Sequence, residues 1–191
     1  MEAISKVQLN KIVKTISIIV IGSILLTISA KIKIPFYPVP MTMQTFVVLF
    51  FGIAFGYKIG LATVTLYLLE GIFGLPVFAN LPEKGIGLVY FTGPTMGYLI
   101  GFLVAVYLVG IRRDLLYWSK KHYVNLLTVF TRLIVSASFI YILGLLWLGS
   151  LIGWDKPIYK LGAEPFLLAE LFKLLLLTAL YPWIKKLDKI I

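Results

Sequence analysis

The sequence predicts an all-α integral membrane protein, built as a bundle of six transmembrane helices. Of its 191 residues, 60% are hydrophobic and only 14% are charged, and the mean hydropathy is +0.99. Soluble domains are nearer half apolar and a quarter charged, so this excess of apolar residues indicates a lipid environment. We expect residues 1–191 to form a single six-helix membrane domain.

Six apolar runs supply the expected helices. The second and third runs are shorter than the roughly 20 residues that a span needs, and a turn at 56–58 separates them. We expect these two helices to be lengthened by flanking residues or sheltered inside the bundle, and a count of five spans is the alternative. The runs cover residues 12–30, 43–56, 59–73, 93–111, 123–151 and 165–183.

The basic residues between the runs predict the orientation of the chain, because Lys and Arg in short loops favour the cytoplasmic side. We expect both termini and the loop 112–121 to be cytoplasmic, and structured loops at 31–42, 74–92 and 152–164 to face outward. The expected cytoplasmic set is Lys6, Lys11, Lys14, Lys58, Arg112, Arg113, Lys120, Lys121, Lys185, Lys186 and Lys189. The expected outward set is Lys31, Lys33, Lys84, Lys156 and Lys160.

Two of the expected outward loops are apolar and unable to continue a helix. Residues 35–40 contain three prolines, which fix their own φ and push the preceding residues to extended geometry. Residues 74–80 read Gly-Leu-Pro-Val-Phe-Ala-Asn and are similarly apolar. Such segments are poorly suited to open water, so we expect them to fold back as a lid over a cavity. The alternative is a pair of stiff connectors lying among lipid headgroups.

Glu170 and Lys173 are the two charged residues inside the last apolar run. Their i, i+3 spacing places both on one face of a helix, and Lys173 is about 12 Å along the helix from Pro165. Each such charge costs about 2.5–3.5 kcal/mol in the middle of a membrane, and ionisable residues there usually serve a function. We therefore interpret the pair as facing a polar ligand; a self-satisfied ion pair is the alternative.

Further polar residues recur at the same expected depth. Thr42 and Gln44 open the second run, Asn80 follows the Gly-Leu-Pro segment, and Tyr98 begins the fourth run. Alone, each has an ordinary explanation, such as a helix cap for Thr42 or an interfacial aromatic for Tyr98. Together they predict a polar pocket near the outward side of the bundle.

The first run carries small residues on one face, which include Gly22, Ser23 and Thr27. Faces of this kind let membrane helices approach closely. The pattern predicts equally well internal packing and a docking surface for another membrane subunit.

Composition excludes several other kinds of function. The chain has no cysteine and a single histidine, His122, so we expect no metal site, no cofactor and no catalytic triad. It has no P-loop sequence for binding ATP. The net charge of +10 does not indicate nucleic-acid binding, because the cations lie at the ends of apolar runs.

Four blocks in order resemble the BioY family: residues 34–45, 74–79, 93–98, and Pro165-Phe166-Leu167 with Glu170 and Lys173. The resemblance implies a six-helix subunit in the cell membrane that binds biotin near its outer face. The resemblance thus implies the S component of an energy-coupling factor (ECF) transporter, whose coupling module has one membrane protein and two ATPase subunits. The family commonly has Asp where this chain has Glu170, and Pro-Gly where it has Leu168-Ala169. Ser23 and Thr27 replace alanines of the docking face.

The polar residues match the chemistry of biotin, whose ureido edge has two N–H donors beside one C=O. We expect Glu170 and Asn80 to accept from the N–H groups. Lys173 is expected to donate to the ureido oxygen or to pair with the biotin carboxylate. The remaining alternatives are an S component for another vitamin, a stand-alone secondary transporter or channel, and a membrane enzyme with Glu170 as base.

Overall fold

The computed structural model describes residues 6–79, 85–111, 113 and 122–190. Asn80, which the sequence predicts to bind the ligand, lies outside these residues. The described part is mostly helical. Its elements are α1 (Lys6–Lys31), β1 (Lys33–Ile34), β2 (Met41–Thr42), α2 (Gln44–Ile72), α3 (Met96–Gly110), α4 (His122–Ile152), α5 (Ile158–Gly162) and α6 (Leu167–Ile184), with 3₁₀ helices η1 (Gly87–Thr92), η3 (Glu164–Phe166) and η4 (Lys185–Ile190).

Helix α2 is two helical arms folded back on each other. Gly56 interrupts it with φ 80° and ψ 174°, a backbone conformation that residues with a side chain rarely adopt. Gln44 Nε2 donates to Tyr67 OH at 2.7 Å, although 23 residues of straight helix would separate the two by about 35 Å. The predicted turn between two helices is therefore present, and Gly56 forms it. Arg113 donates to Ala54 O at 2.8 Å. This carbonyl lies at the end of the first arm, where no further helical N–H group is available to bond to it.

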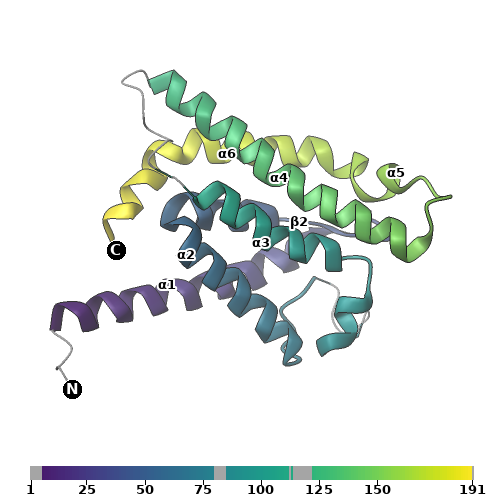
Figure 1. Ribbon diagram of the computed structural model, residues 1–191, viewed down its shortest axis with the longest axis horizontal. Helices are drawn as coiled ribbons and strands as arrows, with labels where there is room; N and C mark the ends of the chain where they lie inside the picture. The colour runs from purple at the N-terminus through teal and green to yellow at the C-terminus, as the bar shows by residue number, and fades with distance from the viewer. Residues whose placement is uncertain (1–5, 80–84, 112, 114–121, 191) are drawn as a thin grey trace.

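The helices pack in a closed order around α2 and α3 (Figure 1). Helix α1 packs on α2, α2 on α3, α3 on α4, and α4 on α6, which returns to contact α2. The apolar segment of α2 is the most enclosed. In its apolar stretch of 18 residues, 61% of the residues are buried, compared with 22% in α1. The core therefore lies where α2, α3, α4 and α6 meet.

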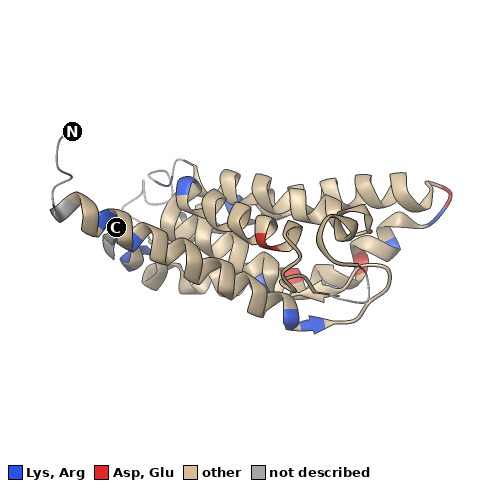
Figure 2. Ribbon diagram, turned by 90° about the horizontal axis from the view of Figure 1, so that it is seen from below, with Lys and Arg blue, Asp and Glu red and all other residues tan. Residues whose placement is uncertain are grey.

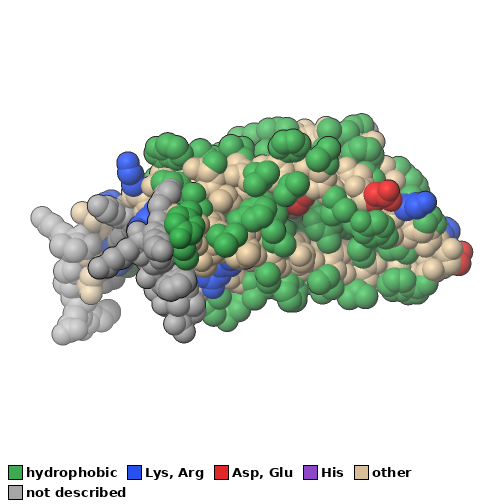
Figure 3. Space-filling view, turned by 90° about the horizontal axis from the view of Figure 1, so that it is seen from above, with side chains coloured by type: hydrophobic (Ala, Val, Ile, Leu, Met, Phe, Trp, Pro, Cys, Tyr) green, Lys and Arg blue, Asp and Glu red, His purple; other side chains and the backbone are tan. Residues whose placement is uncertain are grey.

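Four of the described helical segments are long and apolar enough to cross a membrane: Gln8–Lys31, Gln44–Ile72, Tyr123–Ile152 and Ile158–Leu187. Helix α3 is shorter, at 15 residues, and begins at Met96 because Gly93 is in extended geometry after η1. Hydrophobic side chains cover most of the face in Figure 3, and Lys and Arg lie toward its two ends. Figure 2 shows blue ribbon at both ends of the molecule, and also in a short strand and a helix nearer the middle.

The start of α1 and the 3₁₀ helix η4 lie at one end of the bundle, as Figure 1 shows, and the strands β1 and β2 lie toward the other. The proline-rich segment forms a small antiparallel hairpin, in which Lys33 pairs with Thr42 and Ile34 with Met41. Its non-helical geometry was expected from the prolines, whereas the strand pairing was not. Residues 38–40 are buried, and so are Val77, Phe78 and Ala79 of the second apolar loop. Part of each loop therefore folds inward, whereas Tyr37 and Leu75 are exposed, and the role of the loops as a lid stays a prediction.

Candidate ligand-binding site

Helix α6 carries the two buried charges of the site. Glu170 and Lys173 are 4% and 7% exposed, and Lys173 Nζ lies 3.1 Å from Glu170 Oε2. The i, i+3 spacing aligns them on the face of α6 that packs toward α2 and α4. Both residues point into the bundle, and α6 exposes Phe172 and Leu175 on its outer side instead.

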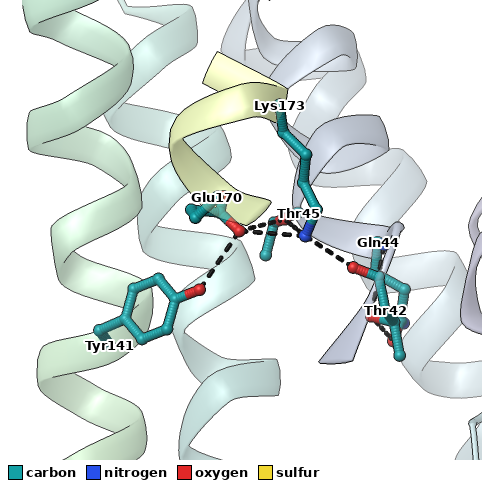
Figure 4. Close-up of polar contacts among 6 residues, drawn as sticks. All are labelled: Thr42, Gln44, Thr45, Tyr141, Glu170 and Lys173. Carbon is teal, nitrogen blue, oxygen red and sulfur yellow. Dashed lines mark hydrogen bonds and ion pairs between the residues drawn. The ribbon is translucent and has the colours of Figure 1, made fainter. Parts of the chain in front are cut away.

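Lys173 uses its three N–H donors on acceptors within the protein. Its Nζ donates to Thr42 O at 2.7 Å, to Thr45 Oγ1 at 3.0 Å and to Glu170 Oε2 at 3.1 Å (Figure 4). An ammonium has only three donors, so this set accounts for all of them. Lys173 thus ties the start of α2 to α6.

The two carboxylate oxygens of Glu170 differ in their hydrogen-bond partners. Its Oε2 accepts from Thr45 Oγ1 at 2.9 Å, from Tyr141 OH at 3.2 Å and from Lys173. Its Oε1 is buried and has no hydrogen-bond partner among the described residues. A buried charged acceptor left unsatisfied costs several kcal/mol, so this oxygen is suited to accept from a bound molecule.

A cavity lies beside this ion pair, where α2, α3, α4 and α6 meet the two inward-folded loops. The room it leaves for the centres of water-sized molecules is about 60 Å³, and the cavity is partly open at its mouth. Its polar lining is Thr42, Gln44, Thr45, Thr95, Glu170 and Lys173, and its larger apolar and aromatic lining is Met41, Tyr67, Phe78, Tyr90, Tyr98, Phe102, Tyr141 and Phe166.

Aromatic rings form much of the cavity wall and pack on one another. Phe78 stacks on Tyr90 with ring centroids 4.5 Å apart and meets Tyr67 edge-on at 5.3 Å. Tyr98 and Tyr141 are perpendicular at 6.3 Å. Such contacts fix ring positions, so the wall is a defined apolar surface.

The structure brings Thr42, Gln44 and Tyr98 to the cavity, but it also gives their polar atoms internal partners. Thr42 Oγ1 donates to Gln44 Oε1 at 3.1 Å, and Gln44 donates to Tyr67. The Tyr98 hydroxyl donates to Gly162 O at 2.8 Å and so holds α5. Tyr98 therefore lines the cavity with its ring, and its predicted role in ligand binding stays a prediction.

The docking role predicted for the small-residue face of α1 needs correction for two of its residues. Ser23 is 1% exposed and donates to Glu70 Oε1 at 2.6 Å, and a Cβ on Gly22 would meet Phe51 and Thr63 of α2. Gly22 and Ser23 therefore serve packing between α1 and α2, because they face into the bundle and are not available as a docking surface. Thr27 is half-buried and donates to Ser23 O, so it remains the accessible member of the set.

Two site residues were absent from the predicted set: Thr45 and Tyr141. Thr45 directly follows Gln44 in the block after the prolines, so its place beside a predicted site residue could have indicated it. Tyr141 lies in the middle of the long apolar run of α4, away from either interface, and a tyrosine there requires a buried partner.

The fold and the cavity define a multi-pass helical membrane protein with a partly polar pocket between its helices. Its sequence matches the BioY family over residues 3–189, and the chain belongs to that family.

Relatives in other organisms match over most of their length. The chain is 34% identical over 164 residues to the "Biotin transporter BioY" of Thermotoga maritima, covering 86% of this chain and 91% of that protein. It is 32% identical over 160 residues to the "Probable biotin transporter BioY" of Pyrococcus horikoshii, covering 84% and 89%.

A solved structure has the same fold. It is described as the crystal structure of the S-component for biotin from an ECF-type ABC transporter. It superposes with a TM-score of 0.75 at 23% sequence identity, covering 96% of this chain and 95% of the other.

Proposed function

We propose that this chain binds biotin and serves as the S component of an ECF-type transporter. The observation that carries the proposal is the Oε1 atom of Glu170, a buried carboxylate oxygen beside the cavity without a protein donor. The ureido edge of biotin offers N–H donors to such an oxygen. Membership of the BioY family and the names of the relatives favour transport over catalysis.

In the proposed pose, the ureido group lies beside the ion pair. One N–H donates to Glu170 Oε1, and the ureido oxygen then lies on the side of Lys173. To reach it, Lys173 exchanges its bond to Thr45 Oγ1 for one to the ligand, while Thr45 keeps its own donation to Glu170. Charge-assisted bonds of this kind contribute about 1.5–3 kcal/mol each.

The rest of biotin matches the remaining lining. Its fused rings and valeryl chain are apolar and lie against aromatic side chains such as Phe78, Tyr90 and Tyr98. Asn80 is proposed to accept from the second ureido N–H, and Thr42 and Gln44 to shape the pocket at the start of α2.

In the membrane, we propose that both arms of α2 span the bilayer, which gives six spans with both termini in the cytoplasm. The pocket then lies toward the outer face of the cell membrane. Biotin would be delivered to a coupling module with one membrane subunit and two ATPases. Uptake of labelled biotin into vesicles tests this: we expect it to require the coupling module and ATP. Uptake by this chain alone under an ion gradient would favour a secondary transporter.

Two binding experiments with purified protein test the ligand assignment. A thermal-shift screen should show stabilisation by biotin and none by thiamine or riboflavin; the opposite result would indicate an S component for another vitamin. Biotin methyl ester should bind as tightly as biotin if Lys173 donates to the ureido oxygen. A loss of affinity of tenfold or more would show that Lys173 pairs with the carboxylate.

A further inference from the structure

Three consecutive backbone carbonyls of the second apolar loop each accept a hydrogen bond from a different side chain. Tyr67 OH donates to Val77 O at 3.3 Å, Lys31 Nζ donates to Phe78 O at 2.7 Å, and Lys33 Nζ donates to Ala79 O at 2.8 Å. The two lysines come from the end of α1 and from β1, about 46 residues away in sequence. Side chains from other segments of the protein therefore hold residues 77–79 in place.

Two of these three residues form part of the ligand cavity. Phe78 and Ala79 line it, and they are 1% and 6% exposed. The Phe78 ring fills a space beside Gly71 that a Cβ would close, and it stacks on Tyr90. The cavity wall thus depends on ring packing on its inner side and on the lysine bonds on its outer side.

The lysine bonds are suited to hold this wall because the segment is not part of a helix or strand. Within the segment, Val77 N donates to Leu75 O at 2.8 Å. A bond from an ammonium to a carbonyl is charge-assisted and about twice as strong as a neutral one. Removing the two ammonium groups leaves the carbonyls of Phe78 and Ala79 without these donors.

We propose that Lys31 and Lys33 are positioning residues of the ligand pocket, which hold the wall 77–79 closed and so limit the rate at which ligand enters and leaves. The segment that carries them continues into the hairpin whose residues 39–42 line the cavity from another side. The two loops are therefore tied together and open as one unit. This inference rests on the proposed ligand-binding function, but its first test does not need the ligand.

The chain contains no cysteine, so a single introduced thiol reports on the wall without background. In Ala79→Cys the new thiol lies in a buried position, while the backbone carbonyl that accepts from Lys33 is kept. We expect a water-soluble maleimide to react at least about tenfold faster when Lys31→Met and Lys33→Met are added, since two charge-assisted bonds are lost. The matched control is Lys160→Met, which removes a lysine from α5, away from this wall.

Ligand exchange supplies the second readout. Protein loaded with labelled biotin and chased with unlabelled biotin should lose label faster in the double variant, and association should also be faster, so the Kd changes less than either rate. Arginine at both positions retains a charged donor and should restore slow exchange. Where the double variant does not fold, Lys33→Met alone gives the same comparison with a smaller change.

Equal maleimide rates in the variant and parent backgrounds would overturn the proposal, as would slow exchange in the double variant. A higher Kd with an unchanged dissociation rate would also contradict it. If no variant binds biotin, the proposed function fails, whereas the thiol measurement still decides whether the lysines hold the wall.

Discussion

Lys173 and Glu170 form an ion pair in which one carboxylate oxygen takes all the protein's donors. Oε2 accepts from Lys173, Thr45 and Tyr141, and Oε1 has no partner among the residues that the structure describes. A pair that served stability alone would be expected to satisfy both oxygens, because a half-satisfied buried network is costly. The arrangement instead leaves one fixed acceptor beside a cavity, and the predictions below depend on this asymmetry.

Thr45 should control the orientation of the carboxylate. Thr45→Val removes the donor to Glu170 Oε2 and the acceptor of Lys173 while keeping a similar shape. We expect biotin binding to weaken about tenfold by isothermal titration calorimetry, since one hydrogen bond contributes about 1 kcal/mol or more. Thr45→Ser keeps the hydroxyl and should bind nearly as the parent. Equal affinities for the two variants would contradict this role.

Two pocket tyrosines provide a matched pair. Tyr141→Phe removes a bond to Glu170, so we expect the Kd for biotin to rise about three- to tenfold. Tyr98→Phe removes a bond to Gly162 that holds α5, so it should lower the thermal midpoint with a smaller change in Kd. The reverse pattern would show that the Tyr98 hydroxyl is the one used in binding.

Bulky substitutions should distinguish the packing residues from the docking candidate on the small-residue face of α1. Ser23→Trp places a large side chain where Ser23 is buried against Glu70, so we expect it to destabilise the fold in a thermal-unfolding assay. Thr27→Trp, at a half-exposed position, should leave biotin binding intact and reduce ATP-driven uptake through the coupling module. Unimpaired uptake by Thr27→Trp would remove the last candidate of the predicted docking set.

Gly56 should be hard to replace. With φ 80° and ψ 174° it lies in a region that only glycine adopts readily, and a Cβ there would come within 3.0 Å of the Arg113 side chain. Gly56→Ala should destabilise the protein by about 1–3 kcal/mol, which corresponds to a fall in the thermal midpoint of several degrees. An unchanged midpoint would show that the turn between the two arms tolerates another geometry.

The helices and the ion pair could be predicted because each leaves a signal in a short stretch of sequence. Apolar runs bounded by charges mark α1, α4 and α6, and Glu170 with Lys173 stands out as two charges within one such run. Three prolines are likewise sufficient to predict that the segment before α2 is not helical.

The partners within the site could not be predicted in the same way. Thr45 meets Glu170 across 125 residues of sequence and Tyr141 across 29, and nothing in a threonine or a tyrosine alone specifies such a contact. The face of α1 shows the same limit. Periodicity placed Gly22 and Ser23 on one side of the helix, but only packing showed that this side meets α2.

The most direct test is titration calorimetry of biotin against Glu170→Gln, Glu170→Asp and, as a control, Glu164→Gln at an exposed glutamate of η3. Glu170→Gln keeps the size of the side chain but loses the charged acceptor, so the Kd should rise about 10- to 100-fold. Glu170→Asp keeps a carboxylate and should lose less, and Glu164→Gln should bind as the parent. If Glu170→Gln binds biotin as tightly as the parent protein, the free carboxylate oxygen is not the ligand's acceptor and the assignment of the site is wrong.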